Sequence, residues 1–99
     1  MPMSPTEPRS ALIIGAGDAT GGAIARKFAA NGYITCCTRR TADALEPLLK
    51  DIRADGGTAH GFGTDARDED QTVELFQKIE SEIAPLEVLI FNIGANVYF

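Results

Sequence analysis

Small residues and glycines form a stretch that could hold an anion: Gly15-Ala16-Gly17-Asp18-Ala19-Thr20-Gly21. An apolar run, residues 11–14, precedes it, and a run with helical periodicity follows, so the pattern predicts strand, tight turn and helix. Glycine permits positive φ and lets a ligand approach the backbone without a Cβ in the way. The first turn of the helix offers unpaired N–H groups and the positive end of the helix dipole. Such a loop is typical of pyrophosphate binding.

Four apolar runs, residues 11–14, 33–38, 58–62 and 88–91, alternate with amphipathic runs along the chain. The amphipathic runs predict helices that end near Gly32, near Gly56 and before Pro85. Strict alternation of strand and helix predicts an α/β fold with a doubly wound parallel sheet of Rossmann type, in the order β-α-β-α-β-α-β. We expect the strand order 3-2-1-4, which is the first half of such a sheet. Ligands of these folds bind beyond the carboxyl ends of the strands, where the strand order reverses.

The two later helices carry more specific signals. Asp43 with Glu46 three residues later predicts a capping box, and Pro47 then falls in the first turn, where its missing N–H costs little. Acidic residues over 65–70 predict the start of the third helix. The expected buried stripe of the second helix is Leu45, Leu48, Leu49 and Ile52, and that of the third is Val73, Phe76, Ile79 and Ile83.

Composition excludes two classes of partner. The 99 residues carry a formal net charge of −5, which argues against nucleic acid and against an anionic membrane surface. No apolar run approaches the length that spans a bilayer. The adjacent Cys36 and Cys37 point to opposite faces of a strand, so they cannot pair, and a reduced, cytoplasmic setting is expected. Residues 1–9, with three prolines, are expected to form a flexible tail.

The glycine spacing resembles that of one family. The pattern G-x-G-x-x-G fails because Thr20 stands at its last position. The pattern G-x-x-x-G-x-G fits better, with Gly15 first, Ala19 in the middle place and Gly21 last. This stretch resembles the T-G-x-x-x-G-I-G loop of the short-chain dehydrogenase/reductase family. Ile14, Ala19 and Thr20 depart from that loop at its Thr, its second Gly and its Ile.

Two further stretches resemble the same family. Gly63-Thr64-Asp65-Ala66 resembles its D-V segment after the third strand. The resemblance implies that Asp65 meets the adenine ring, flanked by the amide of Ala66; Asp65 could instead be a helix N-cap. Phe91-Asn92-Ile93-Gly94 resembles the N-N-A-G segment, with departures at Phe91 and Ile93. The resemblance implies that Asn92 ties neighbouring strands together and that Ile93 and Gly94 lie along the ribose.

The second strand bears on which cofactor is bound. In NAD-preferring members of the family an acid ends this strand, and here Arg39 takes its place, with Arg40 next. Two guanidinium groups suit a 2′-phosphate, so NADP is expected rather than NAD. The alternative is that both arginines belong to a solvated basic turn. Asp18 argues the other way, because many NADP-preferring members carry a basic residue there.

The resemblance implies an NAD(P)-dependent oxidoreductase that transfers a hydride between a nicotinamide and a carbonyl or alcohol carbon of a small molecule, without a metal. It also implies a homo-oligomer for the full-length protein. The family's catalytic Ser and Tyr-x-x-x-Lys are not found: Cys37 stands four residues after Tyr33, and one residue follows Tyr98. Residues 10–99 are therefore expected to be the cofactor-binding part of a Rossmann domain, truncated before its catalytic half and inactive alone.

Two other functions stay open. One is a non-catalytic NAD(P)-binding module that senses the cofactor or scaffolds a partner. The other is the group of nucleotide-sugar epimerases and dehydratases, which carry a T-G-x-x-G-x-x-G loop. Asp18 stands where that loop has its second glycine, so this second alternative ranks lower.

Overall fold

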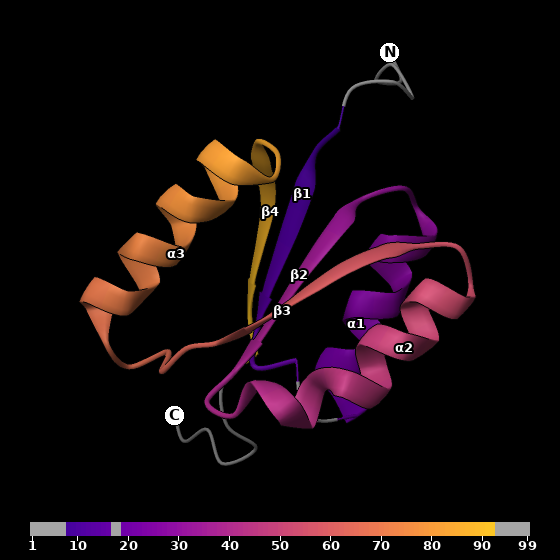
Figure 1. Ribbon diagram of the computed structural model, residues 1–99, viewed down its shortest axis with the longest axis horizontal. Coiled ribbons are helices and arrows are strands. Elements are labelled where there is room, and N and C mark those ends of the chain that lie inside the picture. The colour runs from indigo at the N-terminus through magenta and orange to yellow at the C-terminus, as the bar shows by residue number, and fades with distance from the viewer. Residues whose placement is uncertain (1–7, 17–18, 93–99) are drawn as a thin grey trace, which may run out of the picture.

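The computed structural model describes residues 8–16 and 19–92, which fold around one parallel sheet (Figure 1). Its order is β3-β2-β1-β4, and every pairing is parallel, so the predicted doubly wound topology is confirmed. The strands are Ser10–Ile14 (β1), Ile34–Arg39 (β2), Thr58–Gly63 (β3) and Leu86–Phe91 (β4). The helices are Ala19–Ala30 (α1), Glu46–Ala54 (α2) and Glu69–Glu82 (α3), and a short 3₁₀ helix, Ala42–Leu45 (η1), precedes α2.

Helices cover both faces of the sheet, with α1 and α2 on one side and α3 on the other (Figure 1). The central strand β1 is therefore buried along its whole length. Ala11 and Ile13 pack into the core under α1 and α2, whereas Leu12 and Ile14 pack into the core under α3. This alternation follows from the two-residue period of a strand. Because every pairing is parallel, the carboxyl ends of all four strands lie along one edge.

The adjacent cysteines of β2 face opposite cores, as the strand period predicts. Cys37 lies in the core under α1 and α2, and Cys36 lies in the core under α3. Both thiols are fully buried. Burial raises the pKa of Cys36 to about 11. Burial, with a smaller contribution from Cys36, raises the pKa of Cys37 to about 12. Both thiols are therefore protonated and unreactive at neutral pH.

We expect the folded chain to resist thiol reagents and to lose stability in alkali. The unfolded thiols ionise near pH 9 and the folded ones only near 11 and 12, so stability falls as the pH rises through that interval. Between its unfolded and its folded pKa, each thiol lowers the free energy of unfolding by roughly 1.4 kcal/mol per pH unit. Urea melts at pH 8 and pH 10.5 measure this, with a Cys36→Ala, Cys37→Ala variant as control. If the variant and the wild type lost the same stability between pH 8 and pH 10.5, the expectation would be contradicted.

The ends of α1 and α2 follow the predicted signals. Gly32 and Gly56, just after the two helices, have φ of +90° and +88°, a conformation that side chains with a Cβ rarely adopt. Pro47 lies in the first turn of α2, as predicted. The predicted stripe of α2 is also confirmed: Leu45, Leu48, Leu49 and Ile52 are buried.

The predicted capping box at the start of α2 is wrong. Asp43 lies inside η1, whose N-cap is Thr41, and α2 begins at Glu46 with Leu45 as its N-cap residue. Neither helix has a side-chain cap bond, and Leu45 already has helical φ and ψ. A capping box needs an extended backbone at the N-cap. Here the chain coils one turn earlier, and that turn carries Leu45 into the core.

Two expectations for α3 are also corrected. Its N-cap is Asp68, whose side chain accepts a hydrogen bond from the backbone N–H of Gln71, so Asp65 does not serve as the N-cap. The buried face of α3 carries Leu75 and Ile79, whereas Val73 is 45% exposed. The helix is oriented so that Leu75 packs against the sheet, and in this orientation Val73 faces outward.

Val73 adjoins exposed apolar side chains of the edge strand β4. Together with Phe76, Leu89 and Phe91 it lines an apolar groove, and Leu89 and Phe91 are 39% and 55% exposed. We name these four residues the β4 patch. Within the described residues, β4 is the last strand of the sheet, so its outer backbone groups can pair with another strand.

We expect the 99-residue chain to self-associate through the β4 patch. Leu89→Lys is expected to shift sedimentation profiles toward the monomer, because a charge at an edge opposes strand pairing. Ala54→Lys, at an exposed position in the last turn of α2 on the other face of the sheet, adds the same charge away from the patch and is the matched control. A wild type that stays monomeric over a hundredfold range of concentration, or a control that acts like Leu89→Lys, would refute this.

Candidate cofactor-binding site

A cleft of about 330 Å³ lies at the carboxyl edge of the sheet, where the loops after all four strands meet. Its lining residues come from each of these loops: Gly15, Thr38, Arg39, Arg40, Thr64, Asp65, Ala66, Arg67 and Asn92. Six of the residues proposed from the sequence are thus brought together, although they span most of the chain. A hollow of similar volume between the last turns of α1 and α2 contains none of them.

The glycine loop is fastened to the end of β2. Gly15 has φ of +86°, and its N–H and that of Ala16 both donate to the carbonyl oxygen of Thr38, at 3.1 and 3.0 Å. The chain therefore turns sharply out of β1 and runs toward the start of α1. Ala19, Thr20 and Gly21 are the first three residues of α1, so the helix begins earlier than predicted, inside the stretch that the sequence pattern assigns to the turn.

At Gly21 the backbone of α1 comes closer to the glycine turn than a residue with a Cβ could. A Cβ on Gly21 would lie 2.4 Å from the carbonyl oxygen of Gly15, 2.8 Å from Cα of Ala16 and 2.9 Å from Nδ2 of Asn92. Nδ2 of Asn92 donates to that same Gly15 oxygen at 3.0 Å, and the N–H of Asn92 donates to Ile14 at 2.8 Å. Asn92 therefore ties the end of β4 to β1, as the family resemblance implies, and only glycine fits opposite it.

Four of the proposed residues lie outside the described residues: Gly17, Asp18, Ile93 and Gly94. Their part in the site stays a prediction.

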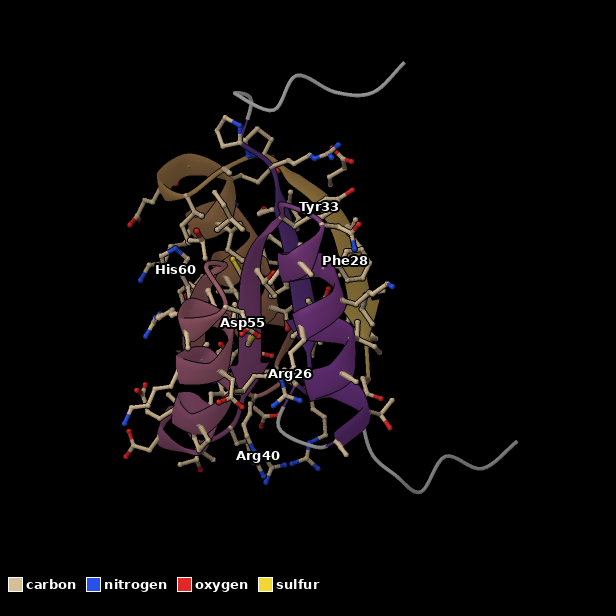
Figure 2. All side chains as sticks on the ribbon, turned by 90° about the vertical axis from the view of Figure 1, so that its right-hand side faces the viewer. Arg26, Phe28, Tyr33, Arg40, Asp55 and His60 are labelled. Carbon is tan, nitrogen blue, oxygen red and sulfur yellow. The ribbon has the colours of Figure 1, made fainter. Side chains whose placement is uncertain are left out.

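Arg39 and Arg40 reach the cleft from the end of β2. Figure 2 shows Arg40 at the opposite end of the molecule from Tyr33, which precedes β2. The carbonyl oxygen of Arg39 accepts the N–H of Thr64 at 2.9 Å, so the loop after β3 is fastened to the loop after β2. Both arginine side chains are exposed, and among the ion pairs of residues 8–16 and 19–92 none includes Arg39.

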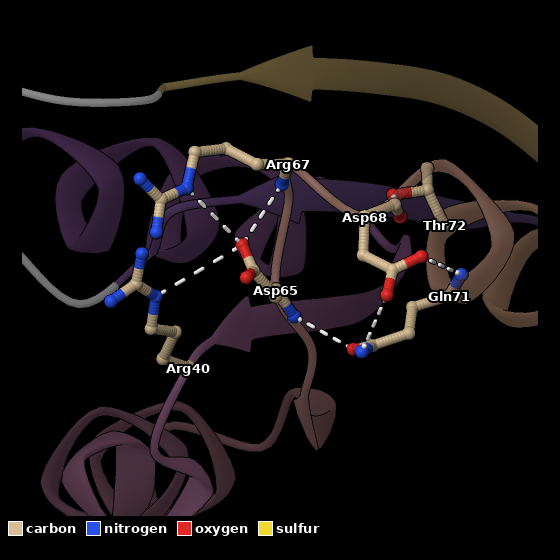
Figure 3. A network of polar contacts seen from close by, with 6 residues as sticks. All are labelled: Arg40, Asp65, Arg67, Asp68, Gln71 and Thr72. Carbon is tan, nitrogen blue, oxygen red and sulfur yellow. Dashed lines mark hydrogen bonds and ion pairs between the residues drawn. The ribbon is translucent and has the colours of Figure 1, made fainter.

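Asp65 is the centre of a polar network in this cleft (Figure 3). Its Oδ1 accepts the backbone N–H of Arg67 at 3.0 Å and lies 3.5 Å from Nε of Arg67. The same oxygen lies 4.0 Å from Nε of Arg40. The N–H of Asp65 donates to Oε1 of Gln71 at 3.0 Å. Asp65 is thus held by its backbone and its side chain at the mouth of the cleft.

Sequence reasoning missed two contributors. Thr38 is a buried strand residue whose carbonyl oxygen anchors the glycine loop, and no side-chain pattern indicates such a role. Arg67 stands two residues after Asp65 and four residues after the end of β3. A basic residue so close to the carboxyl end of a strand is the signal that could have identified it.

The described residues contain no group of three or more His, Cys, Asp or Glu side chains placed to hold a metal ion. In the same part of the chain, no helix combines the length and apolar character needed to cross a membrane.

Comparison with known proteins agrees with this architecture. A family model described as short chain dehydrogenase matches residues 9–98. The chain belongs to the short-chain dehydrogenase/reductase family. A curated relative, 2,3-dihydro-2,3-dihydroxybenzoate dehydrogenase of Bacillus subtilis, is 31% identical over 85% of this chain and 32% of its own length.

Solved structures of short-chain dehydrogenases superpose on the chain. One from Rhodopseudomonas palustris has a TM-score of 0.81 and 43% identity, and the match covers 92% of this chain and 42% of the other. A metagenomic short-chain oxidoreductase in complex with NADP has a TM-score of 0.80 and 27% identity, over 87% and 39%. The chain thus spans less than half the length of these relatives.

Family membership gives the departures from the family pattern a structural meaning. Ala19 replaces the middle glycine at the first residue of α1, where helical φ is negative and alanine is well tolerated. Phe91 replaces the first asparagine of N-N-A-G at the end of the edge strand, where its side chain is exposed rather than packed. The last glycine of the family loop is present here as Gly21, where the backbone of the turn comes closest.

Proposed function

We propose that this chain is the cofactor-binding part of an oxidoreductase that uses NADP in preference to NAD. When bound, such a cofactor supplies or accepts the hydride exchanged with a carbonyl or alcohol carbon of a small molecule. The observation that carries the proposal is the cleft itself, where Gly15 of the glycine loop, two arginines at the end of β2 and Asp65 share one lining. For the full-length protein we further propose a homo-oligomer in the cytoplasm.

The residues of the cleft fit a dinucleotide. A Cβ at Gly21 would close the glycine turn, so the chain keeps backbone exposed where a pyrophosphate would approach the first N–H groups of α1. Asp65 and Ala66 line the same cleft and would border the adenine ring. Among the described residues no group bonds to Oδ2 of Asp65, so this oxygen is available to accept an adenine amino hydrogen.

The arginines support NADP over NAD. A 2′-phosphate accepts charge-assisted hydrogen bonds from guanidinium groups, whereas the bare hydroxyl of NAD offers nothing comparable. One such contact contributes about 1–3 kcal/mol, which corresponds to roughly fivefold to 150-fold in affinity. Asp18 would oppose the phosphate by a smaller, screened repulsion. The metagenomic relative was solved with NADP, which agrees with this preference.

Titration of the purified chain with NADP and NAD tests the proposal by binding rather than by turnover. The chain itself is expected to show no turnover, because its sequence contains no Tyr-x-x-x-Lys. The wild type is expected to bind NADP at least about fivefold more tightly than NAD, the lower end of the range for one charged contact. An Arg39→Asp, Arg40→Ala variant is expected to shift toward NAD, and Lys27→Ala, at the far end of α1, is the control. Equal affinities in the wild type, or an unmoved preference in the variant, would disprove NADP selectivity.

A further inference from the structure

Arg67 lies beside Arg40 on a shared carboxylate (Figure 3). Nε of Arg67 is 3.5 Å from Oδ1 of Asp65, and Nε of Arg40 is 4.0 Å from the same atom. In Figure 3 the two guanidinium groups lie one above the other, on the same side of the Asp65 carboxylate. The two side chains come from different loops, one after β2 and one after β3, so the pair exists only in the folded chain.

The carboxylate that gathers them is held in place without the arginine side chains. Oδ1 of Asp65 accepts the backbone N–H of Arg67, and the N–H of Asp65 donates to the side chain of Gln71. The carbonyl oxygen of Asp65 accepts the N–H of Asp68, the N-cap residue of α3. Loss of either guanidinium would leave these bonds intact.

The terminal nitrogens of both arginines remain available. Among the described residues, the contacts of Arg40 and Arg67 with Asp65 use only their Nε atoms, and their side chains are 63% and 70% exposed. Arg39, Arg40 and Arg67 outnumber Asp65 at this cleft, so it is locally positive in a chain of net charge −5. Two adjacent guanidinium groups with free Nη atoms match the paired oxygens of a phosphate.

We propose that Arg67 is a specificity-determining residue that forms, with Arg40, a two-guanidinium clamp for the 2′-phosphate of the adenosine half of NADP. This inference rests on the proposed function and adds to it a residue from the loop after β3. Asp65 keeps the two like-charged groups together before the ligand arrives. The dianionic phosphate then relieves the repulsion between them, and a 2′-hydroxyl does not.

Adenosine 2′,5′-bisphosphate and adenosine 5′-monophosphate are the probes that isolate the 2′-phosphate. Each is titrated calorimetrically into the wild-type chain, Arg67→Ala, Arg67→Met and the control Lys27→Ala at low and moderate salt. Arg67→Met keeps the aliphatic stem, and both Arg67 variants keep the backbone bond to Asp65. Lys27 is exposed in the last turn of α1, so its loss changes the net charge equally at a distance.

Both Arg67 variants are expected to bind the bisphosphate about tenfold more weakly, the effect of one charged contact, and the monophosphate less than about threefold more weakly. Lys27→Ala is expected to match the wild type. Equal losses for both probes, or an unchanged preference for the bisphosphate, would overturn the clamp while leaving NADP selectivity standing. A wild type that binds both probes equally would instead overturn the proposed NADP preference, and the clamp with it.

Discussion

Gly21→Ala is expected to destabilise the chain and to abolish dinucleotide binding. The added methyl group would lie 2.4 Å from the carbonyl oxygen of Gly15 and 2.8 Å from Cα of Ala16, and backbone atoms cannot rotate away as a flexible side chain can. Overpacking of this kind costs about 1–3 kcal/mol or more. It exceeds the gain of up to about 1 kcal/mol from alanine in a helix. The turn must open, which also displaces Asn92 from its hydrogen bond to Gly15.

Gly22→Ala is the matched control, one residue further along α1. A Cβ there would lie 3.6 Å from Cδ1 of Leu48 and 3.8 Å from the carbonyl oxygen of Ala16, both ordinary contacts. This variant is expected to keep cofactor affinity and to gain up to about 1 kcal/mol from helix propensity. Thermal melts and NADP titrations of both variants check the pair. A Gly21→Ala chain that melts and binds like Gly22→Ala would show that the turn is more compliant than its geometry indicates.

The parts of the fold that could be predicted are those in which local signals agree. The apolar run of β1 ends at Gly15, and Gly32 follows α1, so both boundaries are encoded in a few neighbouring residues. The alternation of strand and helix then implies a parallel sheet, and the sheet places the polar residues after its strands along one edge.

The parts that could not be predicted depend on which residues meet in space. The pairing of Arg67 and Arg40 through Asp65 joins residues that are 25 and 27 positions apart in the chain, and no local pattern indicates it. The exposure of Val73 also depends on tertiary packing. Leu75 is buried against the sheet, and this orientation of α3 leaves Val73 exposed. Asp65 resembled an N-cap only because the start of α3 is acidic throughout; the hydrogen bond to Gln71 belongs to Asp68.

Leu45→Ala is expected to cause a large loss of stability. Leu45 is fully buried although it lies in the connection between β2 and α2. It packs over Gly61 of β3 so closely that a Cβ on this glycine would lie 3.5 Å from Cδ1 of Leu45. A leucine-to-alanine change at such a site costs about 2–5 kcal/mol. For a chain of this size that corresponds to a fall in Tm of roughly 10 to 30 °C. Because η1 begins two residues after Arg40, the variant is also expected to weaken selection for the 2′-phosphate.

The chain could coil at residues 42–45 because Asp43 caps a helix there or because Leu45 is buried in the core. Asp43→Ala, compared with Leu45→Ala, separates these two explanations. If Asp43 capped a helix, its loss would cost about 0.5–2 kcal/mol. In the structure Asp43 is exposed inside η1, and no side-chain cap bond holds that helix, so the expected change is within about 0.5 kcal/mol. Urea unfolding of both variants decides between them. A costly Asp43→Ala beside a mild Leu45→Ala would mean that the local cap directs this turn; the reverse result would mean that burial of one leucine in the core does so.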